Sequence, residues 1–121
     1  MHKRIMIADD SAVMRQMLGL FLKEAGYTVV EAVDGRDAFE RLQAEQVDML
    51  ITDVNMPNMD GISLVREVRT QSSLRFIPII VLTTEYTESK REEGRRAGAT
   101  GWIVKPFKED QLHAVVRKVL G

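Results

Sequence analysis

Short apolar runs alternate with longer amphipathic segments along the whole chain. The runs are continuous rather than alternating, which is typical of parallel strands that have helices on both faces. They lie at residues 5–8, 28–30, 49–51, 77–82 and 102–104, and each predicts one strand. Pro78 stands near the start of the fourth run, where a missing N–H is least costly to a sheet.

The segments between the runs carry apolar residues at the spacing of a helical face. The clearest stripe begins at Met14, and Gly26 beyond its end is a good stop signal. A second clear stripe begins at Leu112. Shorter stripes around Phe39 and Val65 predict two further helices.

The segment 87–97 differs from the other helical segments. It is rich in charged residues, has almost no apolar stripe, and contains Gly94, which costs roughly 1 kcal/mol relative to alanine inside a helix. We expect a solvated and weakly anchored helix there. Such an element suits a partner surface or a mobile part of the fold.

Five strand–helix repeats predict an α/β fold with a doubly wound, parallel sheet. Ligands of such sheets bind beyond the carboxyl ends of the strands, at the topological switch point. The residues of chemical interest that fall at such ends are Asp9, Asp10, Asp53, Thr83 and Lys105. Their shared position at strand ends indicates a ligand site more strongly than any one of these residues does.

Composition excludes several classes of function. The chain has 121 residues, the size of one domain, and its net charge of -1 gives no reason to expect nucleic acid or a membrane surface as a partner. It has no cysteine, which excludes disulfides, thiolate catalysis and cysteine metal sites. No segment predicts a signal peptide or a membrane span, so we expect a cytoplasmic protein.

The three aspartates predict a metal site. Like charges at close range resist joint ionisation, and a hard divalent cation relieves that repulsion. Carboxylate oxygens suit Mg²⁺, with Asp9, Asp10 and Asp53 as ligands and the backbone carbonyl of Asn55 as one more. The alternative is that Asp10 or Ser11 only caps the first helix.

Asp53 is the candidate nucleophile, because a carboxylate can accept a phosphoryl group as an aspartyl-phosphate. The alternative is that it merely ends a strand before a turn. Lys105 would offset the charge of the phosphoryl group, or would be a solvated lysine at a strand end. Thr83 would donate its hydroxyl to a phosphoryl oxygen, or would stand at the strand end only because threonine favours β-strands. The bond between Lys105 and Pro106 is a candidate cis peptide.

At this point the chain resembles a response-regulator receiver domain over its whole length. The matching residues, in order and spacing, are Asp9-Asp10, Asp53, Met56-Pro57, Asp60-Gly61, Thr83 and Lys105-Pro106-Phe107. The resemblance implies a flavodoxin-like (βα)5 fold with strand order 2-1-3-4-5. It also implies that residues 1–121 form one receiver domain without an output domain, and the stretch 97–107 is similar to the single-domain regulators of chemotaxis.

The resemblance further implies the activity and the partners. Asp53 would take a phosphoryl group from a sensor histidine kinase with Mg²⁺ as cofactor, and the domain would later hydrolyse its own acyl phosphate. The output would be a switch in binding to a flagellar motor switch protein, and a phosphatase would be a further partner. We expect a monomeric signalling phospho-acceptor rather than an enzyme acting on other substrates.

Two residues depart from the family's usual pattern. Thr83 and an aromatic residue form the family's coupled switch, but the aromatic is commonly Tyr or Phe and here is Trp102. The larger indole puts the usual rotation in doubt. Thr84 stands where a smaller residue is common, and it would narrow the access to Asp53.

Other functions stay open at this stage. A phosphorelay intermediate would pass its phosphoryl group to a histidine phosphotransfer domain. A phosphohydrolase of the aspartyl-phosphate type needs a second acid two residues after the nucleophile, and Asn55 holds that position. A nucleotide binder is disfavoured because no glycine-rich loop follows Asp10.

Overall fold

Five parallel strands form one sheet in the order β2-β1-β3-β4-β5, as the resemblance implied. The computed structural model describes residues 2–120. The elements in chain order are β1 Arg4–Ala8, α1 Ala12–Glu24, β2 Thr28–Ala32, α2 Gly35–Ala44, β3 Met49–Thr52, α3 Gly61–Thr70, β4 Ile79–Thr83, α4 Glu88–Ala97, β5 Gly101–Val104 and α5 Glu109–Leu120. The predicted doubly wound α/β fold is therefore confirmed.

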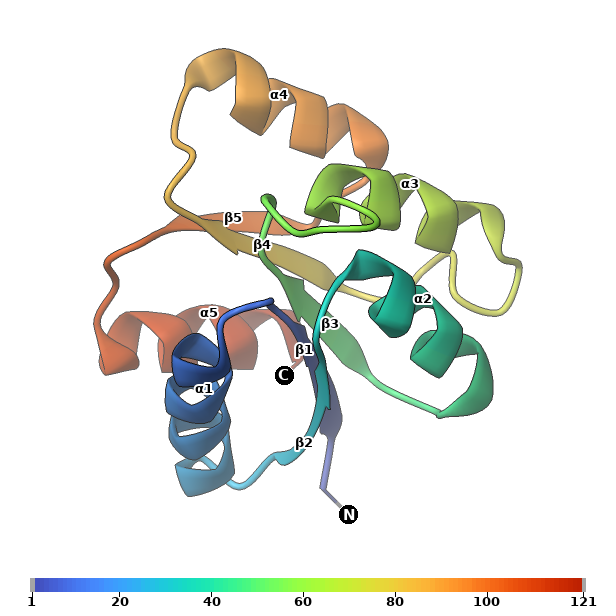
Figure 1. Cartoon of the computed structure of the whole chain (residues 1–121). Helices are drawn as coiled ribbons and strands as arrows, with labels where there is room; N and C mark the ends of the chain where they lie inside the picture. Colours follow the sequence, from blue (N-terminus) through green and yellow to red (C-terminus); the bar gives the residue numbers. More distant parts are fainter. Residues whose placement is uncertain (1, 121) are drawn as a thin grey trace.

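Helices cover both faces of the sheet (Figure 1). α1 and α5 lie on one face, where Leu18 and Leu112 pack into a cluster with β-strand residues such as Ile7. α2, α3 and α4 lie on the other face, where Leu42 and Val65 belong to a second cluster. The two-sided burial explains why the strands are continuous apolar runs.

Two strand boundaries differ from the prediction by two residues, and the others differ by one residue at most. β4 begins at Ile79 rather than at Ile77, because the Ile77 amide donates to the carbonyl oxygen of Leu74 in the preceding turn. β2 extends to Ala32, because Glu31 and Ala32 continue the pairing with β1. Pattern alone misses this extension, since the charged Glu31 interrupts the apolar run.

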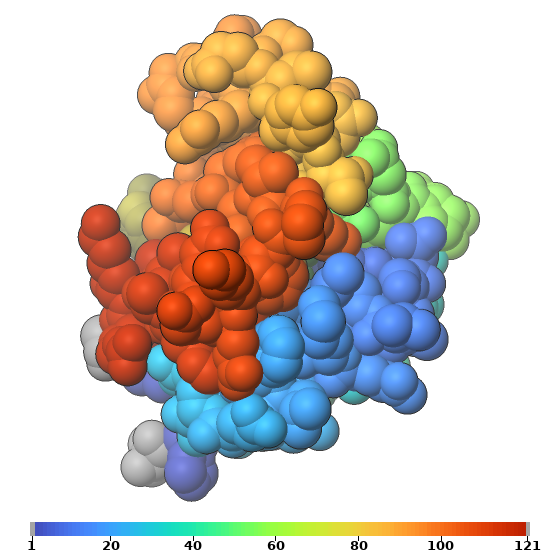
Figure 2. Space-filling model, turned by 90° about the vertical axis from the view of Figure 1, so that its left-hand side faces the viewer, coloured from blue at the N-terminus to red at the C-terminus, as the bar shows by residue number. Residues whose placement is uncertain are grey.

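α4 is the solvated helix that the sequence predicted. Gly94 is its only buried residue. An ion pair ties it to α3, where Arg66 lies 3.3 Å from Glu93, and Lys90 of α4 itself lies 3.3 Å from the same carboxylate. Figure 2 shows α4 as a lobe of its own above β5 and α5. No helix within residues 2–120 is long and apolar enough to cross a membrane.

Candidate functional site

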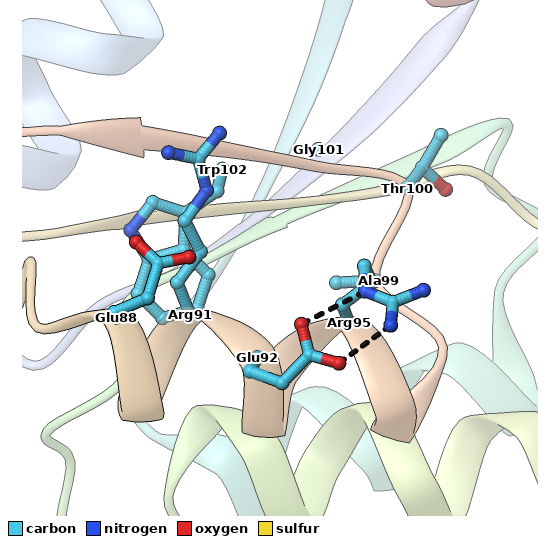
Figure 3. A pocket seen from close by; sticks show the side chains of 8 residues that line it. All are labelled: Glu88, Arg91, Glu92, Arg95, Ala99, Thr100, Gly101 and Trp102. Carbon is cyan, nitrogen blue, oxygen red and sulfur yellow. Dashed lines mark hydrogen bonds and ion pairs between the residues drawn. The ribbon is translucent and has the colours of Figure 1, made fainter.

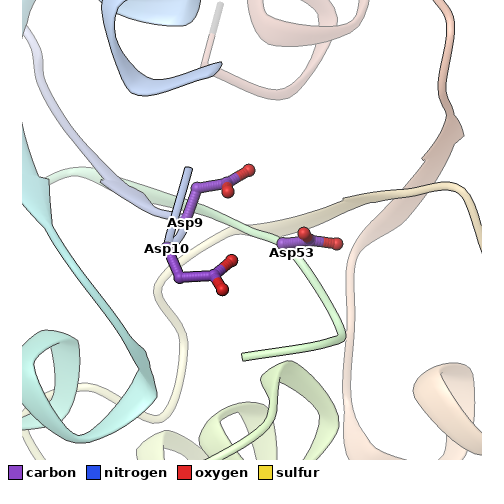
Figure 4. A group of neighbouring side chains, drawn as sticks. All are labelled: Asp9, Asp10 and Asp53. Carbon is purple, nitrogen blue, oxygen red and sulfur yellow. The ribbon is translucent and has the colours of Figure 1, made fainter. Parts of the chain in front are cut away.

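Three carboxylates converge at the carboxyl edge of the sheet (Figure 4). Asp9 and Asp10 follow β1, and Asp53 follows the neighbouring strand β3. One oxygen from each of the three side chains lies within 4.8 Å of the other two. The topology brings them together because parallel neighbours end on the same side, as predicted.

The helix-capping alternative is resolved in favour of Ser11. Ser11 is the N-cap of α1, and its side chain accepts a hydrogen bond from the Met14 amide at 3.2 Å. Asp9 instead accepts from the Ser11 amide at 2.9 Å and is almost fully buried. Neither aspartate is therefore needed as the cap of α1.

Lys105 is not a solvated lysine. Its Nζ lies 3.2 Å from Asp9 Oδ2 and 3.4 Å from Asp53 Oδ2, and its side chain is only 12% exposed. One ammonium group thus bridges two carboxylates that follow different strands, β1 and β3. The Lys105–Pro106 bond is cis, as the sequence suggested.

The segment that follows Asp53 fixes both its side chain and its backbone. Its Oδ1 accepts from the Val54 amide at 2.7 Å. The start of α3 packs directly against the same backbone, because a Cβ added at Gly61 would overlap the carbonyl oxygen of Asp53. The Gly61 amide also donates to the Val54 carbonyl at 2.8 Å. Only glycine allows this approach, which fixes the acidic side chain relative to α3.

Thr83 and Trp102 lie on one face of the sheet. Trp102 pairs with Val81 and Val104 pairs with Thr83 across β4 and β5. Because side chains two residues apart on a strand share a face, Thr83 lies diagonally beside Trp102. Thr83 is fully buried, and its hydroxyl accepts from the Glu85 amide at 3.1 Å.

The loop after Asp53 contains a contact that sequence reasoning missed. Asn58 has a φ of 68°, and its amide donates to the buried Asp34 carboxylate at 2.7 Å. Asp34 also caps α2 by accepting from the Asp37 amide. Asn55 is exposed in the same loop, and its part in metal binding stays a prediction. Turn preference signals Asn58, but no spacing rule could have found its partner 24 residues away.

The donor set fits Mg²⁺. Three carboxylates within a few ångströms, one of them buried, supply the hard oxygen atoms that this ion prefers. Lys105 already balances part of their charge. Among residues 2–120, Asp9, Asp10 and Asp53 are the acidic residues that lie closely enough together to hold a metal ion.

The comparisons with known proteins agree with this geometry. A family model described as the response regulator receiver domain matches residues 5–117. The chain belongs to the response regulator receiver family. Its relatives include the chemotaxis protein CheY1 of Helicobacter pylori, which is 40% identical over 98% of this chain and 97% of its own length.

Solved receiver structures superpose closely on the chain. The chemotaxis protein CheY4 of Vibrio cholerae has a TM-score of 0.94 with 44% identity, covering 99% of this chain and all (100%) of its own. The receiver domain of the sensor histidine kinase PA1611 of Pseudomonas aeruginosa has a TM-score of 0.92 with 30% identity, covering 100% and 99%. That structure holds a magnesium ion coordinated in its active site cleft.

Proposed function

We propose that this receiver domain accepts a phosphoryl group from a sensor histidine kinase onto Asp53 and thereby switches its binding to a flagellar motor switch protein. The observation that carries the proposal is the position of the Lys105 ammonium between the Asp9 and Asp53 carboxylates. The similarity to chemotaxis proteins over nearly the whole chain supports the choice of target. A phosphatase that shortens the signal is a further partner.

The chemistry needs positioning and charge neutralisation more than a base. An Asp53 oxygen attacks phosphorus, the new O–P bond forms, and the P–N bond to the donor histidine breaks with its electron pair staying on the imidazole. Lys105 stabilises the negative charge that arrives with the phosphoryl group. Asp9, Asp10, Asp53 and the backbone carbonyl of Asn55 would hold Mg²⁺, which would supply further charge neutralisation. Water attack on phosphorus later restores the carboxylate and releases phosphate.

The switch follows from the new acceptor oxygens. An aspartyl-phosphate carries strong acceptors and added negative charge. Thr83 leaves the Glu85 amide and turns its hydroxyl toward a phosphoryl oxygen. Because Thr83 and Trp102 share a face of the sheet, this motion changes the space beside the indole. The partner reads the resulting change in the surface of α4, β5 and α5.

Acetyl phosphate labelling tests the acceptor. The wild-type protein should gain one phosphoryl group by intact-mass measurement, only with Mg²⁺, and hydroxylamine should remove it. Asp53→Asn should not be labelled, whereas the matched control Asp110→Asn, at an exposed position of α5, should be labelled fully. Full labelling of Asp53→Asn would overturn the assignment.

A capture experiment tests the output. Beryllofluoride serves as the phosphoryl mimic, and Asp53→Ala serves as the control that cannot bind it. Recovery of a flagellar switch component only with the mimic supports the chemotaxis function. Recovery of a histidine phosphotransfer protein, with or without the mimic, would point to the phosphorelay alternative instead.

A further inference from the structure

The internal glycine of α4 has a structural partner. A Cβ added at Gly94 would lie 2.6 Å from Cζ3 of Trp102, which is closer than real Cβ atoms approach, and 3.2 Å from Cε3, which is a tight contact. The indole therefore occupies the space that any other side chain at position 94 would fill. Figure 3 shows the side chain reaching from β5 toward α4, beside Glu88 and Arg91.

This contact is the main apolar anchor of α4. Gly94 is the only buried residue of the helix, whose surface is otherwise charged or partly exposed. Trp102 in turn packs against the core cluster that contains Val81 and Val65. The indole thus connects α4 to the core. Ala97 of the helix also packs against that cluster, so loss of the indole contact would leave α4 with little apolar contact to the core.

The same indole carries an unfavourable feature. Its Nε1 is buried and finds no acceptor among residues 2–120. A buried N–H without a partner opposes the arrangement that contains it, and an indole turned into solvent would pair that N–H with water. The steric fit at Gly94 thus favours the buried position of the indole, whereas the unsatisfied Nε1–H opposes it. Such opposed contributions suit an element with two positions.

We propose that Gly94 is a positioning residue: because it lacks a side chain, the Trp102 indole packs against α4 at this point, and the indole and the helix change position together. We call this contact between Gly94 and the indole the seat. This answers how the chain accommodates tryptophan at the position of the family's switch aromatic: the larger ring fits because residue 94 lacks a side chain. The link to Asp53 rests on the proposed function. The seat itself does not.

The emission of Trp102 reports the seat directly, because it is the only tryptophan of the chain. Gly94→Ala should shift the emission to longer wavelength and increase quenching by acrylamide, since the methyl group displaces the indole toward solvent. Gly19→Ala is the matched control: it lies inside α1, and an added Cβ has its nearest neighbours at 4.0 Å. It should leave both signals unchanged. Unchanged emission and quenching in Gly94→Ala would overturn the seat.

A second background keeps the test informative if Gly94→Ala folds poorly. With Trp102→Ala the seat is empty of indole, and Gly94→Ala should then raise the Tm by roughly 3–6 °C through helix propensity. With Trp102 present the same change should lower the Tm. A loss of Tm in both backgrounds would mean that position 94 acts without the indole, and would overturn the proposal.

Beryllofluoride affinity tests the connection to Asp53. The seated indole coexists with the hydrogen bond from the Glu85 amide to Thr83. Gly94→Ala weakens that arrangement and should tighten beryllofluoride binding roughly twofold or more, measured by fluorine NMR. Unchanged or weaker binding would overturn the coupling. If the wild type fails to bind the mimic or to take up phosphoryl, the proposed function fails, while the fluorescence result still decides the seat.

Discussion

The guanidinium group of Arg69 donates two hydrogen bonds to the carbonyl oxygen of Gly98, from Nε at 3.1 Å and from Nη2 at 2.8 Å. This pair joins the end of α3 to the turn after α4. The same side chain donates from Nη1 to the carbonyl oxygens of Ile77 and Arg75, in the loop before β4. One arginine thus holds two loops at the amino-terminal end of β4 and β5.

Arg69→Met should lower the free energy of unfolding by about 2–4 kcal/mol, because partly buried carbonyl groups lose their donors. Burial lowers the pKa of Arg69 from its usual value, but a guanidinium remains charged at neutral pH. Urea unfolding measures the change. Arg117→Met, at an exposed position of α5, is the control and should stay within about 0.5 kcal/mol of wild type. Equal effects of the two substitutions would contradict the bridging role.

Lys105→Met should slow phosphoryl uptake by about 10²–10³-fold, the usual effect of removing one stabilising group from a charged transition state. The rate of labelling by acetyl phosphate measures it. Lys108→Met removes an exposed lysine from the same loop and should keep the wild-type rate. A normal rate in Lys105→Met would show that the ion pairs with Asp9 and Asp53 are only structural.

Asp10→Asn should weaken Mg²⁺ binding by at least roughly tenfold, since the substitution removes one of the three carboxylates that would hold the ion. Isothermal titration calorimetry measures the affinity directly. The wild-type Trp102 emission should also respond to Mg²⁺, and Asp9→Ala combined with Asp10→Ala should remove that response. Asp110→Asn is the control. Unaltered calorimetric affinity in Asp10→Asn would exclude this residue as a ligand.

Asp34 should make stability depend on pH. The Asp37 amide and then the Asn58 side chain lower the pKa of Asp34 below its ordinary value of 3.8. A lowered folded-state pKa contributes stability at pH values above the ordinary pKa, and this contribution is lost as the pH falls through the folded-state value. The difference in unfolding free energy between wild type and Asp34→Ser should therefore shrink as the pH falls below about 5 and then through the lowered folded-state pKa.

The Asn58 contact supplies the companion test. Asn58→Gly keeps a residue that accepts the positive φ while it removes the amide donor. The pKa of Asp34 should then move up toward its ordinary value. The stability that this carboxylate loses on acidification should therefore be smaller, and the loss should be complete at a higher pH. An acid-unfolding profile identical to wild type would mean that Asn58 does not hold the carboxylate in solution.

Local pattern determined a large part of this molecule. Short continuous apolar runs that alternate with helical segments are typical of strands buried on both faces of a parallel sheet, so the α/β class followed from the sequence. The shared carboxyl edge then placed Asp9, Asp10, Asp53, Thr83 and Lys105 near one another, because parallel strands end on one side. The charged segment 87–97 likewise predicted the solvated helix α4.

Tertiary structure alone decided the pairings between distant residues. From the sequence, Gly94 could be read only as a residue that destabilises its helix. The structure shows that it makes room for the indole of Trp102, which depends on how α4 packs against β5. Asp34 and Asn58, like Arg69 and Gly98, meet through loops whose paths no periodicity describes. Periodic patterns report which face of an element is buried, whereas side-chain contacts between elements depend on packing in three dimensions.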